Sequence, residues 1–264
     1  MTHGVPTGME SDGSGAKPPR IATPRERRID APVSARPGPR SVESLEVIPR
    51  ERNEKASRAL NLTLGTLALV IVSPLLVLIA LVLKMTSRGP ILYAQTRVGL
   101  DRRWRSTLAF RERRLEDLGG QVFTIYKFRT MRVDAERGSG AVWAKENDPR
   151  VTKLGKYMRI LRLDELPQFW NVVLGDMNIV GPRPERPSIV SRLREDIPEY
   201  QFRHRVKPGI TGLAQINQNY DASLDDVRSK VGWDLRYINE QGFWLDVKIM
   251  LRTVPSILLK YRGW

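Results

Sequence analysis

Residues 159–185 read RILRLDELPQFWNVVLGDMNIVGPRPE, and this stretch decides how the rest of the chain is interpreted. It places two adjacent carboxylates, Asp164 and Glu165, directly after a basic segment that includes Arg159. Carboxylate oxygens are ligands that suit Mg²⁺, and arginine suits phosphate because its planar guanidinium donates two parallel hydrogen bonds. The combination is what an enzyme that handles phosphate groups together with a divalent metal would need.

The same stretch ends in the turn Gly181-Pro182-Arg183-Pro184-Glu185. Proline fixes φ and lacks a backbone N–H, so we expect the two prolines to hold Arg183 on a stiff segment. A second interpretation is open at this point. Acidic pairs are common caps at helix starts, and nearby arginines often form surface ion pairs. Spacing alone does not separate a phosphate site from such a surface.

Composition limits the classes of function. The 264 residues are enough for one ordinary domain with a tail, and the net charge of +15 favours nucleic acid, an acidic membrane surface or a phosphorylated substrate as partner. The chain has no cysteine, which excludes disulfides and thiolate metal sites. With His3 and His204 as the two histidines, a histidine-rich zinc site is excluded too. Acid–base or nucleophilic chemistry therefore falls to carboxylates, Lys, Tyr or Ser/Thr.

Residues 1–48 contain no Phe, Tyr or Trp and are rich in Pro, Gly, Ser and Arg. Such a segment buries too little apolar surface to offset its chain entropy, so we predict a disordered tail. An apolar core of the kind found in signal peptides is missing near its start, and the segment is not expected to direct secretion.

The segment 49–88 is predicted to enter a membrane. Its uncharged core, Leu60–Leu83, would form a helix of about 36 Å, longer than a bilayer core of about 30 Å. A spanning helix is the simplest interpretation, but both flanks are basic and Ser73-Pro74 lies in the middle. A re-entrant helix that bends there keeps both flanks on the cytoplasmic side. The carbonyl that Pro74 frees then needs a partner, which Ser73 or Thr66 could supply.

Residues 89–264 are predicted to form the soluble part, an α+β fold that is mainly helical with a small sheet. Strands are expected near 91–96 and 121–128. Helices are expected over 151–163, 188–200, 225–241 and 245–259. The first should carry an apolar stripe, and the third an apolar face: Leu154, Tyr157, Met158 and Leu161 in the first, Val227, Val231, Leu235 and Ile238 in the third. The last is expected to be interrupted at Pro255, and its amphipathic pattern fits either a helix that lies on a membrane or an ordinary packed helix. Pro208-Gly209 and Thr211-Gly212 are predicted to be tight turns that bring backbone close to another group. A dinucleotide-binding fold is not indicated.

Lys127 and Arg129 alternate with the aromatic residues Tyr126 and Phe128. In a strand this spacing puts the two cations on one face and the aromatic rings on the other. The pattern fits a half-buried strand with a solvated face. It also fits two cations that point at a diphosphate.

Four stretches, in this order, resemble the bacterial sugar transferase family, the monotopic polyprenyl-phosphate phosphoglycosyl transferases. They are Tyr126-Lys127-Phe128-Arg129-Thr130-Met131, Asp164-Glu165-Leu166-Pro167-Gln168, Gly181-Pro182-Arg183-Pro184-Glu185 and Pro208-Gly209-Ile210-Thr211-Gly212-Leu213-Ala214-Gln215. The resemblance covers roughly residues 60–264, and family members have a re-entrant helix bent at a Ser-Pro step. No multi-helix membrane domain precedes that helix, so the chain looks like a minimal form of the family. Residues 101–120 look like an insertion, either a solvated segment or a contact with anionic lipid.

The resemblance implies transfer of a sugar-1-phosphate from a UDP-sugar to polyprenyl (undecaprenyl) phosphate, with release of UMP, as the first step of an exopolysaccharide or related glycan. It implies that Asp164 is the nucleophile of a covalent phosphosugar intermediate and that Glu165 associates with Mg²⁺. Arg159 and Arg183 are candidates for phosphate or nucleotide contact, followed by Lys127 and Arg129. The expected location is the bacterial cytoplasmic (inner) membrane, with the catalytic domain on its cytoplasmic face.

Two alternatives stay open at this point. One is a membrane-tethered basic module that binds anionic lipid or nucleic acid without chemistry; for an enzyme of this family no nucleic acid partner is expected. The other is a related enzyme that passes the phosphosugar directly to the lipid in a ternary complex. The sugar, the glycan pathway and the oligomeric state are not readable from these residues.

Overall fold

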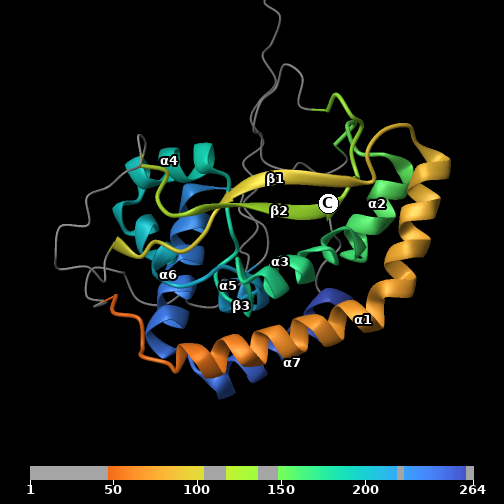
Figure 1. Ribbon diagram of the computed structural model, residues 1–264. Helices are drawn as coiled ribbons and strands as arrows, with labels where there is room; N and C mark the ends of the chain where they lie inside the picture. Colours follow the sequence, from red (N-terminus) through yellow and green to blue (C-terminus); the bar gives the residue numbers. More distant parts are fainter. Residues whose placement is uncertain (1–46, 104–116, 136–147, 219–222, 260–264) are drawn as a thin grey trace, which may run out of the picture. The chain divides into compact units, whose positions relative to one another are not determined.

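The computed structural model describes residues 47–103, 117–135, 148–218 and 223–259 (Figure 1). The predicted tail, apart from its last two residues, and most of the predicted insertion lie outside them. The described elements are mainly helices with little sheet, which confirms the predicted fold class at this level. The helices are α1 (Glu54–Thr86), α2 (Lys153–Ile160), η3 (Leu163–Glu165), α3 (Gln168–Leu174), α4 (Pro187–Asp196), η4 (Pro198–Arg205), α5 (Leu213–Asn217), α6 (Leu224–Glu240) and α7 (Phe243–Leu259); the strands are β1 (Leu92–Val98), β2 (Val122–Phe128), β3 (Asn178–Val180) and β4 (Gly209–Thr211).

The strands form two small sheets within the described residues. β1 and β2 pair antiparallel, from Leu92 opposite Phe128 to Val98 opposite Val122, so both predicted strands are confirmed. β3 and β4 pair in parallel. Gly209 was predicted to lie in a tight turn but belongs to β4, and a Cβ added to it would lie 2.1 Å from the backbone nitrogen of Gly181. Glycine is needed there because two backbone segments approach one another closely.

The main core forms around α6, which packs against η4 and α5. Its apolar residues recur every three to four positions and therefore share one face of the helix. All four residues predicted for that face are buried: Val227, Val231, Leu235 and Ile238. The helix that follows, α7, runs continuously through Pro255, so the predicted interruption is wrong.

The predicted stripe on the helix before the carboxylate pair divides between two environments. α2 is shorter than the range 151–163 expected for it. Leu154 and Met158 pack in a small core with the end of α1, whereas Tyr157 and Leu161 are exposed.

α1 is a single bent helix with Pro74 in its interior (Figure 1). Proline lacks the N–H that would bond to the carbonyl of Val70, four residues earlier. The Ser73 hydroxyl donates to that carbonyl instead, at 2.8 Å, as predicted. Among the described residues α1 is the one helix that is long and apolar enough to cross a membrane, judged by length and composition alone.

Both ends of α1 pack against the rest of the protein, and its middle does not. Near the first end, the guanidinium of Arg58 donates to the carbonyls of Val172 and Val173 in α3, at 2.7 and 2.6 Å. Near the other end, Leu83 packs in the small core with Phe128 of β2. Between them, large apolar side chains are exposed, among them Leu67, Val70, Ile71, Val77 and Leu78.

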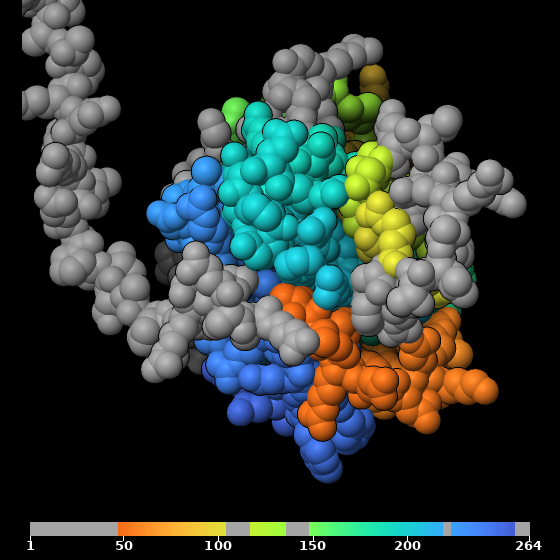
Figure 2. Space-filling view, turned by 90° about the vertical axis from the view of Figure 1, so that its left-hand side faces the viewer, coloured from red at the N-terminus to blue at the C-terminus, as the bar shows by residue number. Residues whose placement is uncertain are grey.

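The residues that precede α1 lie against the C-terminal helices, and Figure 2 shows the start of α1 beside them. The backbone N–H of Arg50 donates to the carbonyl of Ile238 at 3.1 Å. Arg52 pairs with the buried Asp246 of α7 at 3.1 Å. The basic flank of α1 is therefore part of the folded structure and is held close to α6 and α7.

Candidate active site

The carboxylate pair lies on η3, a single 3-10 turn between α2 and α3. Arg162 precedes it in the left-handed region, with φ 57°, where a non-glycine residue is unusual. Neither carboxylate occupies an N-cap position, since Arg162 and Pro167 hold those positions in η3 and α3, and neither helix start has a side-chain capping hydrogen bond. This geometry argues against the interpretation of the pair as an ordinary helix cap.

Glu165 is surrounded by cations. The two Nη atoms of Arg183 donate to its carboxylate at 2.5 and 3.2 Å. Lys127 Nζ lies 3.6 Å and Arg162 Nη1 3.5 Å from the same carboxylate. Burial raises the pKa of Glu165, but Arg183, Lys127 and Arg162 together lower it well below its usual range. Glu165 is therefore ionised at neutral pH, and Arg183 lies directly beside the carboxylate pair.

Asp164 has the opposite environment. Its side chain is buried, with the residue 8% exposed, and its Oδ1 has no hydrogen-bond partner. Burial and the negative charge of Glu165 raise the pKa of Asp164 to about 6, which Lys127 and Arg159 only partly oppose. Two neighbouring carboxyl groups whose pKa values are pushed apart are typical of a site that assigns them different chemical roles.

Lys127 and Arg129 are not equivalent. Lys127 lies on β2 and faces Glu165, and burial lowers its pKa to about 8 although Glu165 opposes the shift. Arg129 follows the end of β2, and its guanidinium donates to the Arg88 carbonyl at 2.7 Å and to the Ser87 hydroxyl at 2.5 Å. Arg129 thus fastens the end of α1 as well as lining the site, and its part in substrate binding stays a prediction.

A cavity of about 1080 Å³ surrounds the pair. This volume is at the upper end of the range for small-molecule sites. The predicted site residues all line it: Lys127, Arg129, Arg159, Asp164, Glu165 and Arg183. Part of its wall comes from α1, through Leu64 and Ala68. Arg159 also donates from Nε to the Thr130 hydroxyl at 3.0 Å, which fixes its side chain against the chain that follows β2.

Further charged residues line the cavity that sequence reasoning did not select: Arg97, Glu185, Arg186 and Lys230. The Glu185 carboxylate forms ion pairs with Arg97 Nη1 at 3.2 Å and with Lys230 Nζ at 3.6 Å. The position of Arg97 at the end of a predicted strand could have indicated that it belongs to the site. No sequence signal marked Lys230, because it is one charged residue among several in α6.

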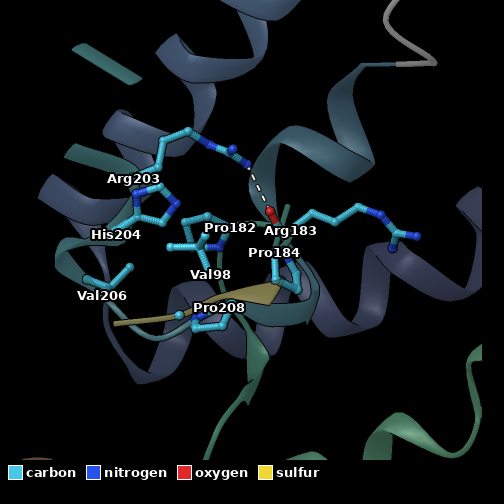
Figure 3. A pocket seen from close by; sticks show the side chains of 9 residues that line it. Val98, Pro182, Arg183, Pro184, Arg203, His204, Val206 and Pro208 are labelled. Atoms are coloured by element: carbon cyan, nitrogen blue, oxygen red, sulfur yellow. Dashed lines mark hydrogen bonds between the residues drawn. The ribbon is translucent and has the colours of Figure 1, made fainter. Parts of the chain in front are cut away.

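The turn that carries Arg183 is held through its own backbone. Its four consecutive carbonyls accept hydrogen bonds from separate parts of the protein. Pro182 O accepts from Gly209 N, Arg183 O from Arg203 Nη2, Pro184 O from Arg97 Nη1 and Glu185 O from Val98 N, at 3.0, 3.1, 3.0 and 2.9 Å. Figure 3 shows the hydrogen bond from Arg203 to the Arg183 carbonyl, with the Arg183 side chain pointing away from Arg203. The predicted stiffness of this turn is therefore strongly supported by contacts beyond its two prolines.

A divalent metal would find two adjacent carboxylates here. No group of three or more His, Cys, Asp or Glu residues that could hold a metal occurs in the part of the chain that the structure describes. Mg²⁺ is commonly held by one or two carboxylates together with substrate phosphates, so Asp164 and Glu165 fit such an ion when a diphosphate is present. The Oδ1 of Asp164 that lacks a hydrogen bond agrees with this.

The profile of a family described as Bacterial sugar transferase matches residues 52–260, which include α1 and every candidate site residue. The chain belongs to the bacterial sugar transferase family. The resemblance that the four motifs indicated is confirmed.

Three relatives illustrate the similarity. The UDP-glucose:undecaprenyl-phosphate glucose-1-phosphate transferase of Escherichia coli K12 is 42% identical over 76% of this chain and 40% of the relative. The UDP-N-acetylgalactosamine-undecaprenyl-phosphate N-acetylgalactosaminephosphotransferase of Aeromonas hydrophila is 40% identical over 76% of this chain and 43% of the relative. An exopolysaccharide production protein of Rhizobium leguminosarum is 34% identical over 78% of this chain and 97% of the relative. The alignment thus spans about two fifths of the first two relatives and nearly all of the third.

Proposed function

We propose that this protein transfers a sugar-1-phosphate from a UDP-sugar to a polyprenyl phosphate such as undecaprenyl phosphate. The observation that carries the proposal is the buried Asp164 beside the cation-bound Glu165, at the wall of a cavity that α1 also lines. The names of the Escherichia coli and Aeromonas hydrophila relatives give a UDP-sugar and undecaprenyl phosphate as substrates, which supports the same two substrate classes here. The product would begin an exopolysaccharide or a related glycan, as the Rhizobium relative's name suggests.

The proposed chemistry proceeds in two steps. An oxygen of Asp164 attacks the sugar-bearing phosphorus, a P–O bond forms, and the bond from that phosphorus to the bridging oxygen breaks, so UMP leaves with the electron pair. An oxygen of the lipid phosphate then attacks the same phosphorus and releases the Asp164 carboxylate. A carboxylate needs no general base once it is ionised. The two-step route allows the soluble product to leave before the lipid reacts.

The cations around the pair offset the repulsion between a carboxylate and a diphosphate. Lys127, Arg159 and Arg183 line the cavity, and each lies near Asp164 or Glu165. Preorganised positive charge of this kind stabilises the charge that develops as the phosphoryl group moves. Mg²⁺, held by Glu165 and Asp164, would supply further charge stabilisation when it is bound.

The test of the proposed function is the intact mass of the purified protein after mixing with UDP-sugars and Mg²⁺, without lipid. A gain equal to one sugar phosphate, with release of UMP, is expected for the correct donor and would identify the sugar. UMP release that needs added polyprenyl phosphate, without any mass gain, would favour direct transfer. If neither occurs with any donor, and the protein binds DNA or anionic vesicles in a salt-dependent way, the binding-module alternative is favoured.

The pH dependence of adduct formation provides a second test. Asp164 must be deprotonated to attack, so its pKa of about 6 predicts that kcat/KM for the UDP-sugar falls as pH drops below about 6. Lys127 must be protonated to attract the diphosphate, so its pKa of about 8 predicts a second fall above about 8. Measuring the first step alone avoids the titration of the lipid phosphate.

Lys127→Arg is the matched control for this profile, because arginine keeps its charge at every pH of the assay. The variant should retain the acidic limb near pH 6 and lose the alkaline one. An acidic limb near pH 4 in the wild-type protein would contradict the assignment of Asp164 as the nucleophile with a raised pKa.

We further propose that α1 is re-entrant and that the domain lies on the cytoplasmic face of the bacterial inner membrane. Support comes from the packing of both ends of α1 against the same folded part, through Arg58 at one end and Leu83 at the other. The exposed apolar middle would enter the lipid. The apolar residues Trp244, Leu251 and Val254 on α7 are also exposed and would lie at the membrane interface.

The absence of cysteine from the sequence allows a direct topology test with single introduced thiols. Lys55→Cys and Lys84→Cys flank the apolar part of α1 and are both exposed. For a re-entrant helix, an impermeant maleimide should label both in inside-out vesicles and neither in intact spheroplasts. Ile71→Cys, in the exposed middle, should resist labelling from both sides. Labelling of one flank from each side of the membrane would show that α1 spans it.

A further inference from the structure

A buried ion pair lies behind the turn that carries Arg183. Arg203 of η4 and Asp234 of α6 have side chains that are 1% and 2% exposed, and Arg203 Nε donates to Asp234 Oδ2 at 2.6 Å. Arg203 Nη1 also donates to the Tyr200 hydroxyl at 2.5 Å, and its guanidinium lies 4.7 Å from the centre of that ring. Three contacts therefore fix the orientation of one guanidinium in the core.

The third nitrogen of this guanidinium, Nη2, contacts the turn that carries Arg183. Arg203 Nη2 donates to the backbone carbonyl of Arg183 at 3.1 Å (Figure 3). The backbone of Arg183 thus contacts Arg203, and its side chain donates two hydrogen bonds to Glu165. A continuous series of contacts thus runs from Asp234 through Arg203 and Arg183 to the carboxylate pair.

Little free space surrounds this arrangement. The gap between the turn and Arg203 has a volume of about 10 Å³, about the size of one water molecule, and its walls include Pro182, Pro184 and the buried His204. Burial lowers the pKa of His204 to about 3, so its ring is neutral and adds no charge beside Arg203. A change in the orientation of Arg203 would break its hydrogen bond to the turn.

Stability alone does not explain why a charged pair is kept here. The desolvation of two buried ions opposes their attraction, and an apolar pair of similar volume often gives an equally stable fold. Apolar side chains would pack in the same place but could not donate a hydrogen bond to the Arg183 carbonyl. The directional contact is what a charged pair provides and an apolar pair cannot.

We infer that Arg203 and Asp234 are positioning residues that act through the backbone of Arg183 to aim its guanidinium at the carboxylate pair. Neither side chain is among those that line the large cavity, so their effect on the reaction is indirect. The inference rests on the proposed function, because it concerns the same site. It assigns a catalytic consequence to two residues that lie outside the four motifs.

The test replaces both charges together, since removing one would leave the other buried and unpaired. Arg203→Met combined with Asp234→Leu should fold, with a melting temperature within a few degrees of the wild-type value. Its kcat/KM for adduct formation should fall by about tenfold to a hundredfold, because small displacements of a catalytic group have effects of this size. Ile238→Val, a conservative core change on the same helix, serves as the stability control and should keep full activity.

A double-mutant cycle with Arg183→Ala separates positioning from general damage to the fold. In the Arg183→Ala background the charge-pair replacement should lower kcat/KM by less than about twofold, because the residue through which it acts is gone. An equal loss in both backgrounds would overturn the inference, as would a fully active charge-pair variant. If the charge-pair variant does not fold, Arg203→Lys takes its place in the cycle. Lysine keeps the charge but lacks the planar set of N–H donors of a guanidinium. The expected result and the result that would overturn the inference are the same as for the charge-pair variant.

The affinity for UDP, measured by calorimetry, gives a readout that needs no turnover. The charge-pair variant should bind UDP more weakly than the wild-type protein. In the Arg183→Ala background the same replacement should leave the UDP affinity unchanged. If the wild-type protein is active, and the charge-pair variant has the same UDP affinity and the same kcat/KM as the wild-type protein, this inference alone is overturned. A wild-type protein that neither binds UDP nor forms an adduct overturns the proposed function and this inference with it.

Discussion

Asp164→Asn is expected to abolish the covalent adduct and to lower sugar-phosphate transfer by at least about a thousandfold. The amide has nearly the shape of the carboxylate but lacks the charged oxygen that attacks phosphorus. In the folded protein the carboxyl is buried and its pKa is raised to about 6. The loss of activity should therefore come from the missing nucleophile and not from a disturbed fold.

Stability separates these two explanations. A carboxyl whose pKa is higher in the folded than in the unfolded state binds its proton more tightly when folded, so the unfolding free energy falls as pH rises through about 6. At pH 7 the ionised Asp164 opposes folding by burial and by repulsion from Glu165. The neutral amide removes both effects, and the variant should melt at or above the wild-type temperature.

The measurement combines intact mass, UMP release and a melting curve on the same preparation. Asp164→Ala is the control that cannot regain a carboxylate by deamidation, and it should be equally inactive. Lipid-dependent transfer by either variant at near wild-type rate would show that the sugar phosphate passes directly to the lipid. An adduct on either variant would place the nucleophile elsewhere.

The local features of this fold could be predicted from the sequence. The apolar residues of α6 repeat with the period of a helix, and all four are buried. The Ser73 hydroxyl satisfies the carbonyl that Pro74 frees, because both residues lie within one helical turn of that carbonyl. The carboxylate pair and the turn at Arg183 were singled out by residue type and selected as a site by their resemblance to family motifs, and the structure brings them into contact.

The contacts that complete the site join segments far apart in the chain. Arg203 meets Asp234 across 31 positions, and Arg129 meets Ser87 across 42, so no local pattern signals either pair. Such features depend on the folded arrangement and not on any single stretch.

Glu165→Gln is expected to lower kcat/KM for adduct formation by about a hundredfold or more, since it removes a charge from the centre of the site. Glu165 contacts Arg183, Lys127 and Arg162 at the same time. Without its charge these cations are no longer held together, and the proposed Mg²⁺ site loses one carboxylate. The concentration of Mg²⁺ needed for half-maximal rate should rise by about tenfold or more.

The variant should also change the pH profile in a defined direction. The charge of Glu165 raises the pKa of Asp164 and of Lys127, so its removal should move both limbs of the kcat/KM profile to lower pH. A profile that keeps both limbs in place would contradict the assignment of these limbs to Asp164 and Lys127. Glu185→Gln is the matched control, because Glu185 is also held by two cations at the wall of the same cavity. It should leave the Mg²⁺ requirement unchanged.

The two roles proposed for Glu165, holding Arg183 and binding the metal, can be distinguished by combining Glu165→Gln with Arg183→Ala. If Glu165 acts only by holding Arg183, the double variant should be no slower than Arg183→Ala and should need no more Mg²⁺. If Glu165 also binds the metal, the Mg²⁺ requirement should rise in both backgrounds. The second result is expected, because Glu165 is one of the two carboxylates proposed to hold the ion together with the substrate diphosphate.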